Sequence, residues 1–524
     1  MLIFLVVSLL SCLLFVWIVN KMDYPYGGSD HALYYKLSDL IRMNHHFPIA
    51  KLERIYQYFN VYPQLYCILC SFIPNEFLLK KANIINHVIM LLMIIAFGFF
   101  SYDILADYFP NATFAFLLAS LSFILTPITY AIWNAKFMGL SARAFGLLLG
   151  HLFGYCCFYY LAGLEWQYST SYQIGIYIVS ICVVIALLTS SIFAFQFFVF
   201  SSLFLSVCTL HFEFLLLGVL AIIFQCLTNF QLAKQFWIAQ YHHKRNYSKY
   251  MAPTWQLAAR PSIWRDFVYD FWTKKDKAYI LGNPVIEIML GALLNIAVFL
   301  FYFFYGDRYD PIQWNLFLLL AASFFAFFVT SLRFGRFLGE PQRYIEFGIP
   351  FACVLACLVF PFWLLVIFLL FDIFVLLWYR KNSQYHRQLP NHIRIRGELL
   401  DFMHDIYDDE YKNLLCNDTE IARHLYISKY RVYVPDHCTY YATKEDFYAA
   451  FYNNDYHIMS PDFLLQSLND AQKGYIIFYT NLLKFYDETK LLPFLNDIQF
   501  VHIKNIGKFK IFKFYKESQC ASQS

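Results

Sequence analysis

The sequence predicts a polytopic α-helical membrane protein with about eleven transmembrane helices, followed by a soluble α/β domain. Three observations support this fold class. Hydrophobic residues make up 60% of the chain and charged residues only 15%, whereas charged residues make up about 25% of average soluble proteins. The apolar residues gather into runs of about 18 or more, which as helices cross about 30 Å of hydrocarbon. After residue 380 charged residues become frequent and the apolar runs shorten to strand length.

The membrane domain is expected to cover residues 1–380. Its first apolar run, 2–20, has no basic start and no A-x-A cleavage site, so we expect a retained helix rather than a cleaved signal. Residues 346–379 should form two helices with a break near Pro361, because proline interrupts a helix. The remaining spans are predicted at residues 84–102, 112–133, 143–163, 172–189, 191–209, 212–230, 281–305 and 314–332.

Two polar stretches interrupt the apolar runs. A long first loop, 21–83, follows the first span and contains a helical pattern at 32–43. The second stretch, 231–277, is basic and rich in tryptophan, which is typical of an amphipathic segment at a membrane surface.

Residues 381–524 are expected to form the soluble domain. Short apolar runs of strand length alternate there with helical patterns, and this alternation predicts a small α/β layer domain. The strands are predicted at 431–434, 475–479 and 508–514, and the helices at 395–407, 444–452 and 463–471.

Composition excludes several classes of function. The net charge of +4 comes with no basic helix and no aromatic-basic motif, so no nucleic-acid partner is expected. Most of the 13 cysteines lie in apolar runs, where they act as small hydrophobic residues. Cys67 and Cys70 have CxxC spacing but no second pair, so zinc or redox chemistry is not expected. Cys416 and Cys438 can pair only if their domain is extracytoplasmic.

The first loop contains the strongest candidate for chemistry, the sequence Gly27-Gly28-Ser29-Asp30-His31. A carboxylate at the membrane surface can act as a general base on an acceptor hydroxyl, or hold a metal ion beside a phosphate leaving group. Asp30 is therefore the candidate catalytic residue, with His31 as its neighbour. The alternative is that Ser29 or Asp30 caps the following helix, and both roles are compatible.

A divalent metal ion is the candidate cofactor. Its candidate ligands are Asp30, His31, His45 and His46. A metal site requires three or four ligands in one place, so this hypothesis depends on the four side chains converging.

Several features together resemble the GT-C glycosyltransferases. A long polar loop follows the first helix, carries an Asp-His pair and ends near Tyr62-Pro63-Gln64-Leu65 before the second span. Multiple spans are followed by a soluble domain, so the resemblance in architecture covers the whole chain. Further matching positions are Pro127, Trp133, Lys136, residues 140–146 and the sequence Gly339-Glu340-Pro341-Gln342-Arg343-Tyr344.

The resemblance implies transfer of a sugar from a polyprenyl-phosphate-linked donor to a glycan, lipid or protein acceptor at the extracytoplasmic face. The family's loop acid corresponds to Asp30. The second acidic pair of the oligosaccharyltransferase branch has no counterpart near Lys136 to Arg143, which argues against protein N-glycosylation.

Basic residues near membrane level are candidate ligands of the lipid phosphate, because an arginine there is costly unless it pairs with an anion. The alternatives are snorkelling to the surface, or pairing of an arginine with Glu340 or Glu346. Arg333 and Arg336 are weaker candidates. The predicted phosphate-binding residues are Arg143, Arg343, Lys136, Glu340 and Tyr344.

The family's topology conflicts with the distribution of positive charge. It places the first loop, both arginine loops and the soluble domain outside a plasma or inner membrane. Lysine and arginine lie mainly on that same side, whereas the positive-inside rule expects them in the cytoplasm. Long polar stretches report topology poorly, and arginines held by an anionic ligand do not report it, so an extracytoplasmic soluble domain remains the expectation.

Three alternative functions stay open. A polymerase or ligase of lipid-linked glycans also needs loop arginines, but its main loop usually comes late in the chain. A transporter or flippase is expected to show internal repeats, and no clear repeat is found. A non-catalytic scaffold would tolerate the loss of Asp30.

Overall fold

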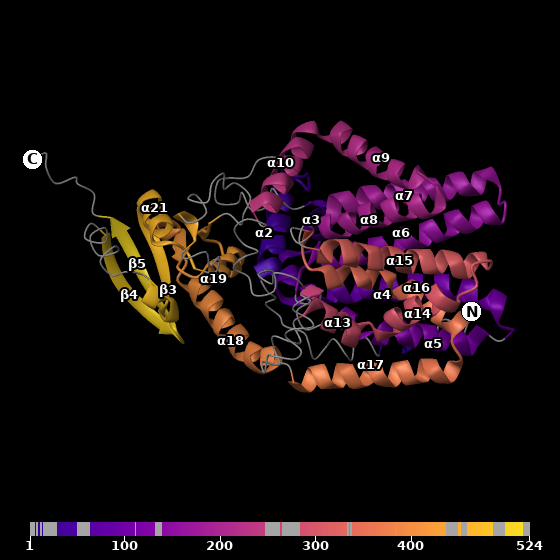
Figure 1. Cartoon of the computed structure of the whole chain (residues 1–524). Coiled ribbons are helices and arrows are strands. Elements are labelled where there is room, and N and C mark those ends of the chain that lie inside the picture. Colours follow the sequence, from indigo (N-terminus) through magenta and orange to yellow (C-terminus); the bar gives the residue numbers. More distant parts are fainter. Residues whose placement is uncertain are drawn as a thin grey trace, which may run out of the picture.

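The fold of the chain is given by a computed structural model (Figure 1). A bundle of helices carries a smaller domain with a five-stranded sheet at one end. The structure describes residues 6, 9–10, 13, 29–49, 63–110, 112–130, 139–246, 263–264, 283–332, 335, 338–382, 384–435, 449–451, 458–485 and 498–516.

The described part of the bundle contains six helices that are long and apolar enough to cross a membrane. A further pair, α13 and α14, is bent by 87° around Ala292. The long helices are α4 (Asn75–Tyr108), α6 (Ala142–Glu165), α7 (Thr170–Ser190), α8 (Ile192–Thr209), α15 (Pro311–Ser331) and the continuous run of η6 (Pro341–Gly348) with α16 (Ile349–Val359). The bent pair is α13 (Pro284–Gly291) with α14 (Leu293–Tyr305). Shorter apolar helices are α5 (Ala112–Leu125) and α9 (Glu213–Thr228), and α17 (Phe362–Asn382) has a shorter apolar part, Phe362–Trp378.

These helices confirm the predicted polytopic membrane fold. The division of 172–230 into three spans matches α7, α8 and α9, and the predicted break near Pro361 lies between α16 and α17. The span predicted at 112–133 is shorter, because Pro127 begins a separate turn, η2 (Pro127–Tyr130). The first predicted span, 2–20, lies mostly outside the described residues, so the count of eleven stays a prediction.

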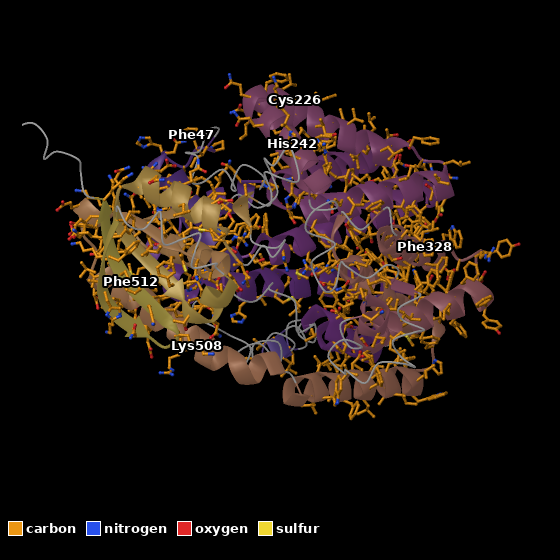
Figure 2. All side chains as sticks on the ribbon, turned by 60° about the vertical axis from the view of Figure 1, so that its left-hand side comes forward. Phe47, Cys226, His242, Phe328, Lys508 and Phe512 are labelled. Carbon is orange, nitrogen blue, oxygen red and sulfur yellow. The ribbon has the colours of Figure 1, made fainter. Side chains whose placement is uncertain are left out.

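The outward faces of the bundle helices are apolar. Phe328 of α15 lies on the outer surface of the bundle (Figure 2), with 53% of the residue exposed. Leu227 at the end of α9 is 81% exposed. Soluble monomers rarely expose large contiguous apolar surfaces, so this surface requires lipid as its solvent.

The centre of the bundle depends on small residues that let helices approach closely. At Gly150 of α6, an added Cβ would lie 2.3 Å from the Phe347 ring, and at Gly154 it would lie 2.4 Å from the Phe351 ring. Such small residues are typical of helix contacts in membranes. Between them, His151 Nε2 contacts the backbone carbonyl of Glu346 at 3.1 Å, so α6 and η6 also share a buried polar contact.

Three helices outside the spans lie at the same end of the bundle as the soluble domain (Figure 1): α2 (Ser29–Met43), α3 (Leu65–Ser71) and α10 (Phe230–Asn246). The predicted first loop therefore contains α2, α3 and the first turns of α4. Helical geometry in α4 breaks at Lys81, close to the predicted start of the span at 84. Cys67 and Cys70 are buried in α3 as free thiols.

The carboxyl-terminal domain has an α/β fold, as predicted. Its sheet order is β2-β1-β3-β5-β4, in which β1 pairs parallel with β2 and β3, while β5 pairs antiparallel with β3 and β4. The strands are β1 (Asn413–Cys416), β2 (Arg431–Tyr433), β3 (Lys473–Tyr479), β4 (Ile498–Ile506) and β5 (Phe509–Lys516). The helices and turns are α18 (Gln384–Asp405), η7 (Asp409–Tyr411), α19 (Thr419–His424), η8 (Leu425–Ile427), α21 (Pro461–Ala471) and η10 (Thr480–Phe485).

Two of these strands, β1 and β4, were not predicted. The helix predicted at 444–452 and the partner proposed for Cys416, Cys438, lie largely or wholly outside the described residues. Cys416 itself is a buried, free thiol in β1.

We predict that Gly154→Ala destabilises the bundle. The added methyl group meets the buried Phe351 ring, and overpacking of this kind costs about 1–3 kcal/mol. The matched control is Gly175→Ala in α7, where an added Cβ has no neighbour within 4 Å. Thermal unfolding of the purified proteins in detergent should show a lower Tm for Gly154→Ala only. Equal Tm values for the two variants would contradict the close packing of α6 on α16.

Candidate functional site

The amino-terminal end of α2 is fixed to the bundle through His31. Its side chain is fully buried, and Nδ1 accepts a hydrogen bond from the backbone N–H of Leu140 at 2.8 Å. Gly139 packs directly on the imidazole: it has a φ of 71°, and an added Cβ would lie 2.6 Å from His31 Nδ1. Asn86 of α4 donates to the carbonyl of Gly139 at 2.5 Å. Burial lowers the pKa of His31 to about 4, so the ring is neutral at pH 7.

This contact places the first turn of α2 beside the start of α6. Asp30 precedes His31 in that first turn. Ser141 caps α6 by accepting from the backbone N–H of Arg143 at 3.3 Å, so α6 begins directly after Leu140. The segments that carry Asp30, His31 and Arg143 are therefore adjacent. Because the backbone N–H groups at a helix start favour anions, the beginning of α6 is electrostatically suited to a phosphate.

The second predicted segment, around η6, carries an ion pair. Arg343 contacts Glu340 at 2.5 Å, and each side chain is 18% exposed. Gln342 donates to Glu287 of α13 at 2.9 Å. The structure thus adopts the pairing of Arg343 with Glu340 that the sequence left open. Tyr344 is fully buried and donates to the carbonyl of Leu338 at 3.4 Å.

Both arginine segments lie towards the soluble-domain end of the bundle. The helix α6 begins beside α2, and α16 leads away from that end before α17 returns to the soluble domain (Figure 1). Arg143 precedes His151 in α6, and Arg343 precedes Glu346 in η6. Because His151 and Glu346 are in contact, both arginines lie on the soluble-domain side of that contact.

The histidines predicted as metal ligands do not lie together in the structure. His31 lies in the first turn of α2, whereas His45 and His46 follow its last turn, about 20 Å away along the helix axis. His46 contacts the hydroxyl of Ser71 at 2.8 Å and stacks on Phe72. These two histidines belong to the opposite end of α2.

The described residues contain no group of three or more His, Cys, Asp or Glu side chains that suits a metal ion. Lys136, Trp133, Arg333 and Arg336 lie outside the described residues, so their predicted roles stay predictions.

Polar residues that sequence reasoning did not identify hold the rest of the first loop. Arg42 donates to the backbone carbonyl of Ser71 at 2.9 Å and also bonds to the carbonyl of Ile73 and the side chain of Asn75. Gln64 forms two hydrogen bonds with the backbone of Ile49, at 2.8 and 2.9 Å. These contacts join the end of α2 and the residues that follow it to α3 and to the start of α4. The sequence contains Gln64 in a matching motif, but nothing in the pattern identifies Arg42.

The soluble domain covers α2 from the other side. The short helix α19 packs on α2, and His424 at its end is fully buried close enough to His31 for the two rings to interact electrostatically. Burial is the main cause that lowers the pKa of His424 to about 3, and the nearby Arg396 and His31 contribute in the same direction. Arg396 is itself paired with Glu420 at 2.9 Å. The helix that carries Asp30 is therefore enclosed between the bundle and the soluble domain.

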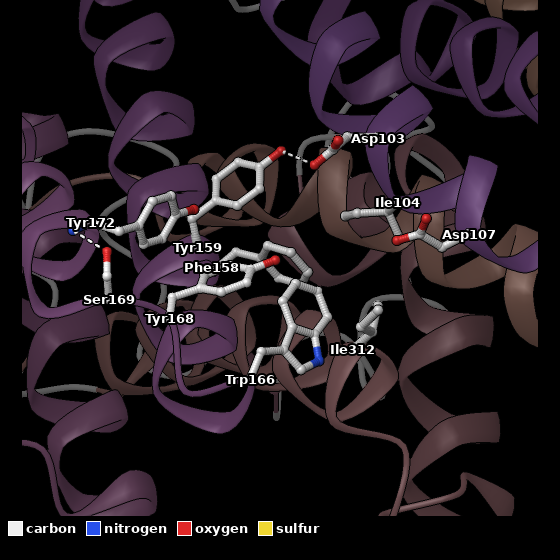
Figure 3. A pocket seen from close by; sticks show the side chains of 10 residues that line it. All are labelled: Asp103, Ile104, Asp107, Phe158, Tyr159, Trp166, Tyr168, Ser169, Tyr172 and Ile312. Carbon is white, nitrogen blue, oxygen red and sulfur yellow. Dashed lines mark hydrogen bonds between the residues drawn. The ribbon is translucent and has the colours of Figure 1, made fainter.

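A separate pocket lies at the opposite end of the bundle (Figure 3). It has a volume of about 320 Å³, and Tyr159 donates to Asp103 on its wall at 2.9 Å. Trp166 and Tyr168 come from the turn after α6. None of the predicted site residues that the structure describes lines this pocket.

The two buried histidines predict that acid loosens the contact between α2 and α19. Their pKa values in the folded chain, about 4 for His31 and about 3 for His424, lie below the value of about 6.5 in an unfolded chain. Their contribution to stability is therefore fully present above pH 6.5 and is lost as the pH falls towards 4 and 3. Asp418 opposes this trend, because burial raises its pKa to about 6, whereas both histidines act in the same direction.

Hydrogen exchange at pH 7.5 and pH 5, corrected for intrinsic rates, measures this effect. The amides of α2 and α19 should exchange faster at pH 5 relative to those of α6. Unchanged relative protection would show that the two histidines do not couple protonation to this contact.

Comparison with known proteins finds solved structures of similar fold. No protein-family model and no curated protein matches the sequence. The AglB oligosaccharyltransferase of Archaeoglobus fulgidus, in complex with an inhibitory peptide and a dolichol-phosphate, is similar with a TM-score of 0.52 at 11% identity, covering 98% of this chain and 74% of that one. An Archaeoglobus fulgidus oligosaccharyltransferase in complex with Zn and sulfate is similar with a TM-score of 0.50 at 12% identity, covering 97% and 73%.

ArnT from Cupriavidus metallidurans, bound to undecaprenyl phosphate, aligns over 98% of this chain and 97% of its own, with a TM-score of 0.47 and 11% identity. At these identities the oligosaccharyltransferase structures establish the fold alone. The chain therefore has the fold of these oligosaccharyltransferase structures. This agrees with the fold that the sequence resemblance implied, in which multiple spans are followed by a soluble domain.

Proposed function

We propose that this protein transfers a sugar from a polyprenyl-phosphate-linked donor to an acceptor hydroxyl at the membrane surface. One observation supports the proposal most strongly. The buried bond from Leu140 N–H to His31 holds the first turn of α2, which contains Asp30, next to the helix start that contains Arg143. A carboxylate and a cation at a helix start are the groups that such a transfer requires.

In the proposed reaction, the acceptor oxygen attacks the anomeric carbon of the donor sugar. The bond from that carbon to the phosphate oxygen breaks, and its electron pair leaves with the lipid phosphate. Asp30 accepts the proton of the acceptor hydroxyl. Arg143 and the N–H groups at the start of α6 stabilise the charge that develops on the leaving phosphate.

The other predicted residues take supporting roles in this proposal. Glu340 holds the guanidinium of Arg343, because the two form an ion pair with little exposure. Arg343 then presents a fixed cation to the donor phosphate. His31 holds α2 in place through its buried ring, so it is a positioning residue rather than a second base.

A metal ion has no step in this mechanism. A zinc ion is present in one similar structure, but the histidines proposed as ligands here lie at opposite ends of α2. The described donor set therefore does not fit one ion.

The acceptor would reach the site from the soluble-domain end, where α19 covers α2. This arrangement supports a reaction at the face that carries the soluble domain. In the proposal that face is extracytoplasmic, in a plasma or inner membrane.

We predict that Asp30→Asn lowers sugar transfer about 10²- to 10⁴-fold, the usual contribution of a general base. The measurement is transfer of radiolabelled sugar from a panel of polyprenyl-phosphate donors in membranes with matched protein levels. The matched control is His45→Gln, which alters an exposed residue at the other end of α2 and should retain transfer. Parallel reactions with EDTA test the metal hypothesis, and transfer should persist.

Equal transfer by Asp30→Asn and the wild type would remove Asp30 from the mechanism. Loss of transfer in His45→Gln or in EDTA would restore the metal hypothesis. If membranes with the wild type support no transfer from any donor, a transporter or scaffold function is favoured instead. Joining of lipid-linked oligosaccharides in place of single sugars would identify a polymerase or ligase.

A further inference from the structure

A second feature at the soluble-domain end is a groove between α8, α9 and α10. It encloses about 400 Å³, and its walls are formed mainly by aromatic and branched aliphatic side chains. The groove opens between α8 and α9, where Val199 and Val219 are 43% and 52% exposed. These helices present apolar outer faces, so the opening faces the lipid side of the bundle. The principal wall residues are Phe195, Phe198, Val199, Val219, Ile222 and Trp237.

Among the described residues that line this groove, Lys244 is the only charged one. It lies in the last turn of α10 and is partly buried. Among the described residues no carboxylate pairs with it. Burial lowers the pKa of Lys244 to about 8, so the side chain is still charged at neutral pH although its surroundings are apolar. A cation in this setting is costly unless an anion compensates it.

The polar end of the groove is connected to η6. Gln196 of α8 accepts from Lys244 Nζ at 2.5 Å and donates to the Tyr344 hydroxyl at 2.9 Å and the Leu338 carbonyl at 3.1 Å. Tyr344 directly follows Arg343, which is paired with Glu340. Lys244 is therefore linked through one glutamine to the segment around Arg343, which is predicted to bind the lipid phosphate.

A larger groove provides a comparison. It encloses about 730 Å³ between α8, α13, α14 and α15, and none of its described lining residues is charged. Its lining suits hydrocarbon of any kind and contains no group that would recognise an anionic headgroup. The smaller groove differs by having one cation at the end nearest η6.

We propose that Lys244 binds the phosphate of the polyprenyl-phosphate lipid and that the groove between α8 and α9 holds the first part of its prenyl chain. This inference rests on the proposed function, because that function supplies the lipid. An ammonium group and a phosphate form a charge-assisted hydrogen bond, and burial of the chain against apolar walls adds hydrophobic free energy. Lys244 is then a donor-binding residue that no sequence motif identified.

Binding of a radiolabelled polyprenyl phosphate without sugar to the purified full-length protein tests the proposal. Lys244→Met should weaken binding about 10- to 100-fold, as expected for loss of a hydrogen bond between charged groups, and Lys244→Arg should bind within a few-fold of the wild type. The matched control is Lys234→Met, an exposed lysine of the same helix, which should bind normally. Uncharged polyprenol should bind equally to the wild type and Lys244→Met.

The walls of the groove are tested by a second pair of variants. Val219→Trp fills the opening and should also weaken binding, because it excludes the chain. Val179→Trp places the same side chain on the outer face of α7, where the residue is 51% exposed and lines none of the three described pockets, and it should have no effect. Melting temperatures of all variants verify that they are folded.

Unchanged binding in folded Lys244→Met would overturn the proposal. Phosphatidylglycerol vesicles that compete as well as unlabelled polyprenyl phosphate would also overturn it, because they would indicate a general site for anionic lipids. Absence of polyprenyl-phosphate binding to the wild type would also overturn it. Because the assay contains no sugar and no acceptor, its outcome is separate from transfer. Asp30→Asn should bind the lipid normally. If the wild type transfers no sugar but its lipid binding still depends on Lys244, the transferase proposal fails and the groove proposal stands.

Discussion

The hydrogen bond from Leu140 N–H to the buried ring of His31 is the contact on which the soluble-domain end of the molecule depends. It joins two segments that are 109 residues apart in sequence, and it requires the positive φ and missing Cβ of Gly139. Because the buried imidazole is neutral, its Nδ1 can accept the hydrogen bond without the free-energy cost of a buried charge. The contact fixes the first turn of α2 at the start of α6, and α19 then covers the same helix from the soluble domain. The anchored helix α2 therefore brings the turn that contains Asp30 next to the start of α6, which contains Arg143.

Much of the membrane fold was predictable, because every span must be apolar over the thickness of the bilayer. The apolar run 172–230 is too long for two spans, and His211 with Glu213 marks one of its turns. Three helices were therefore expected there. The 87° bend at Ala292 was not predictable, because apolar residues continue through it. In the soluble domain β1 has only four residues, and β4 carries exposed polar residues such as His502 and Lys504, so neither gave a clear strand pattern.

The site was predictable in part. Single residues in loops, including Asp30, Arg143 and Arg343, stand out because charge near the membrane is costly, and the structure places their segments at one end of the bundle. The separation of the histidines predicted as metal ligands was already contained in the sequence. A helix predicted over 32–43 separates His31 from His45 by about 20 Å. Arg42, Lys244 and His424 were missed, because their roles depend on contacts with segments distant in sequence, which composition and spacing do not reveal.

The measurement that tests the anchoring of α2 most directly is sugar transfer by Gly139→Ala. The added methyl group meets His31 and a left-handed backbone that disfavours alanine, so α2 must shift while the centre of the bundle keeps its packing. The account predicts that transfer falls at least tenfold, that the Tm stays close to that of the wild type, and that protease accessibility of α2 rises. Normal transfer with normal accessibility would contradict the claim that this contact positions the site.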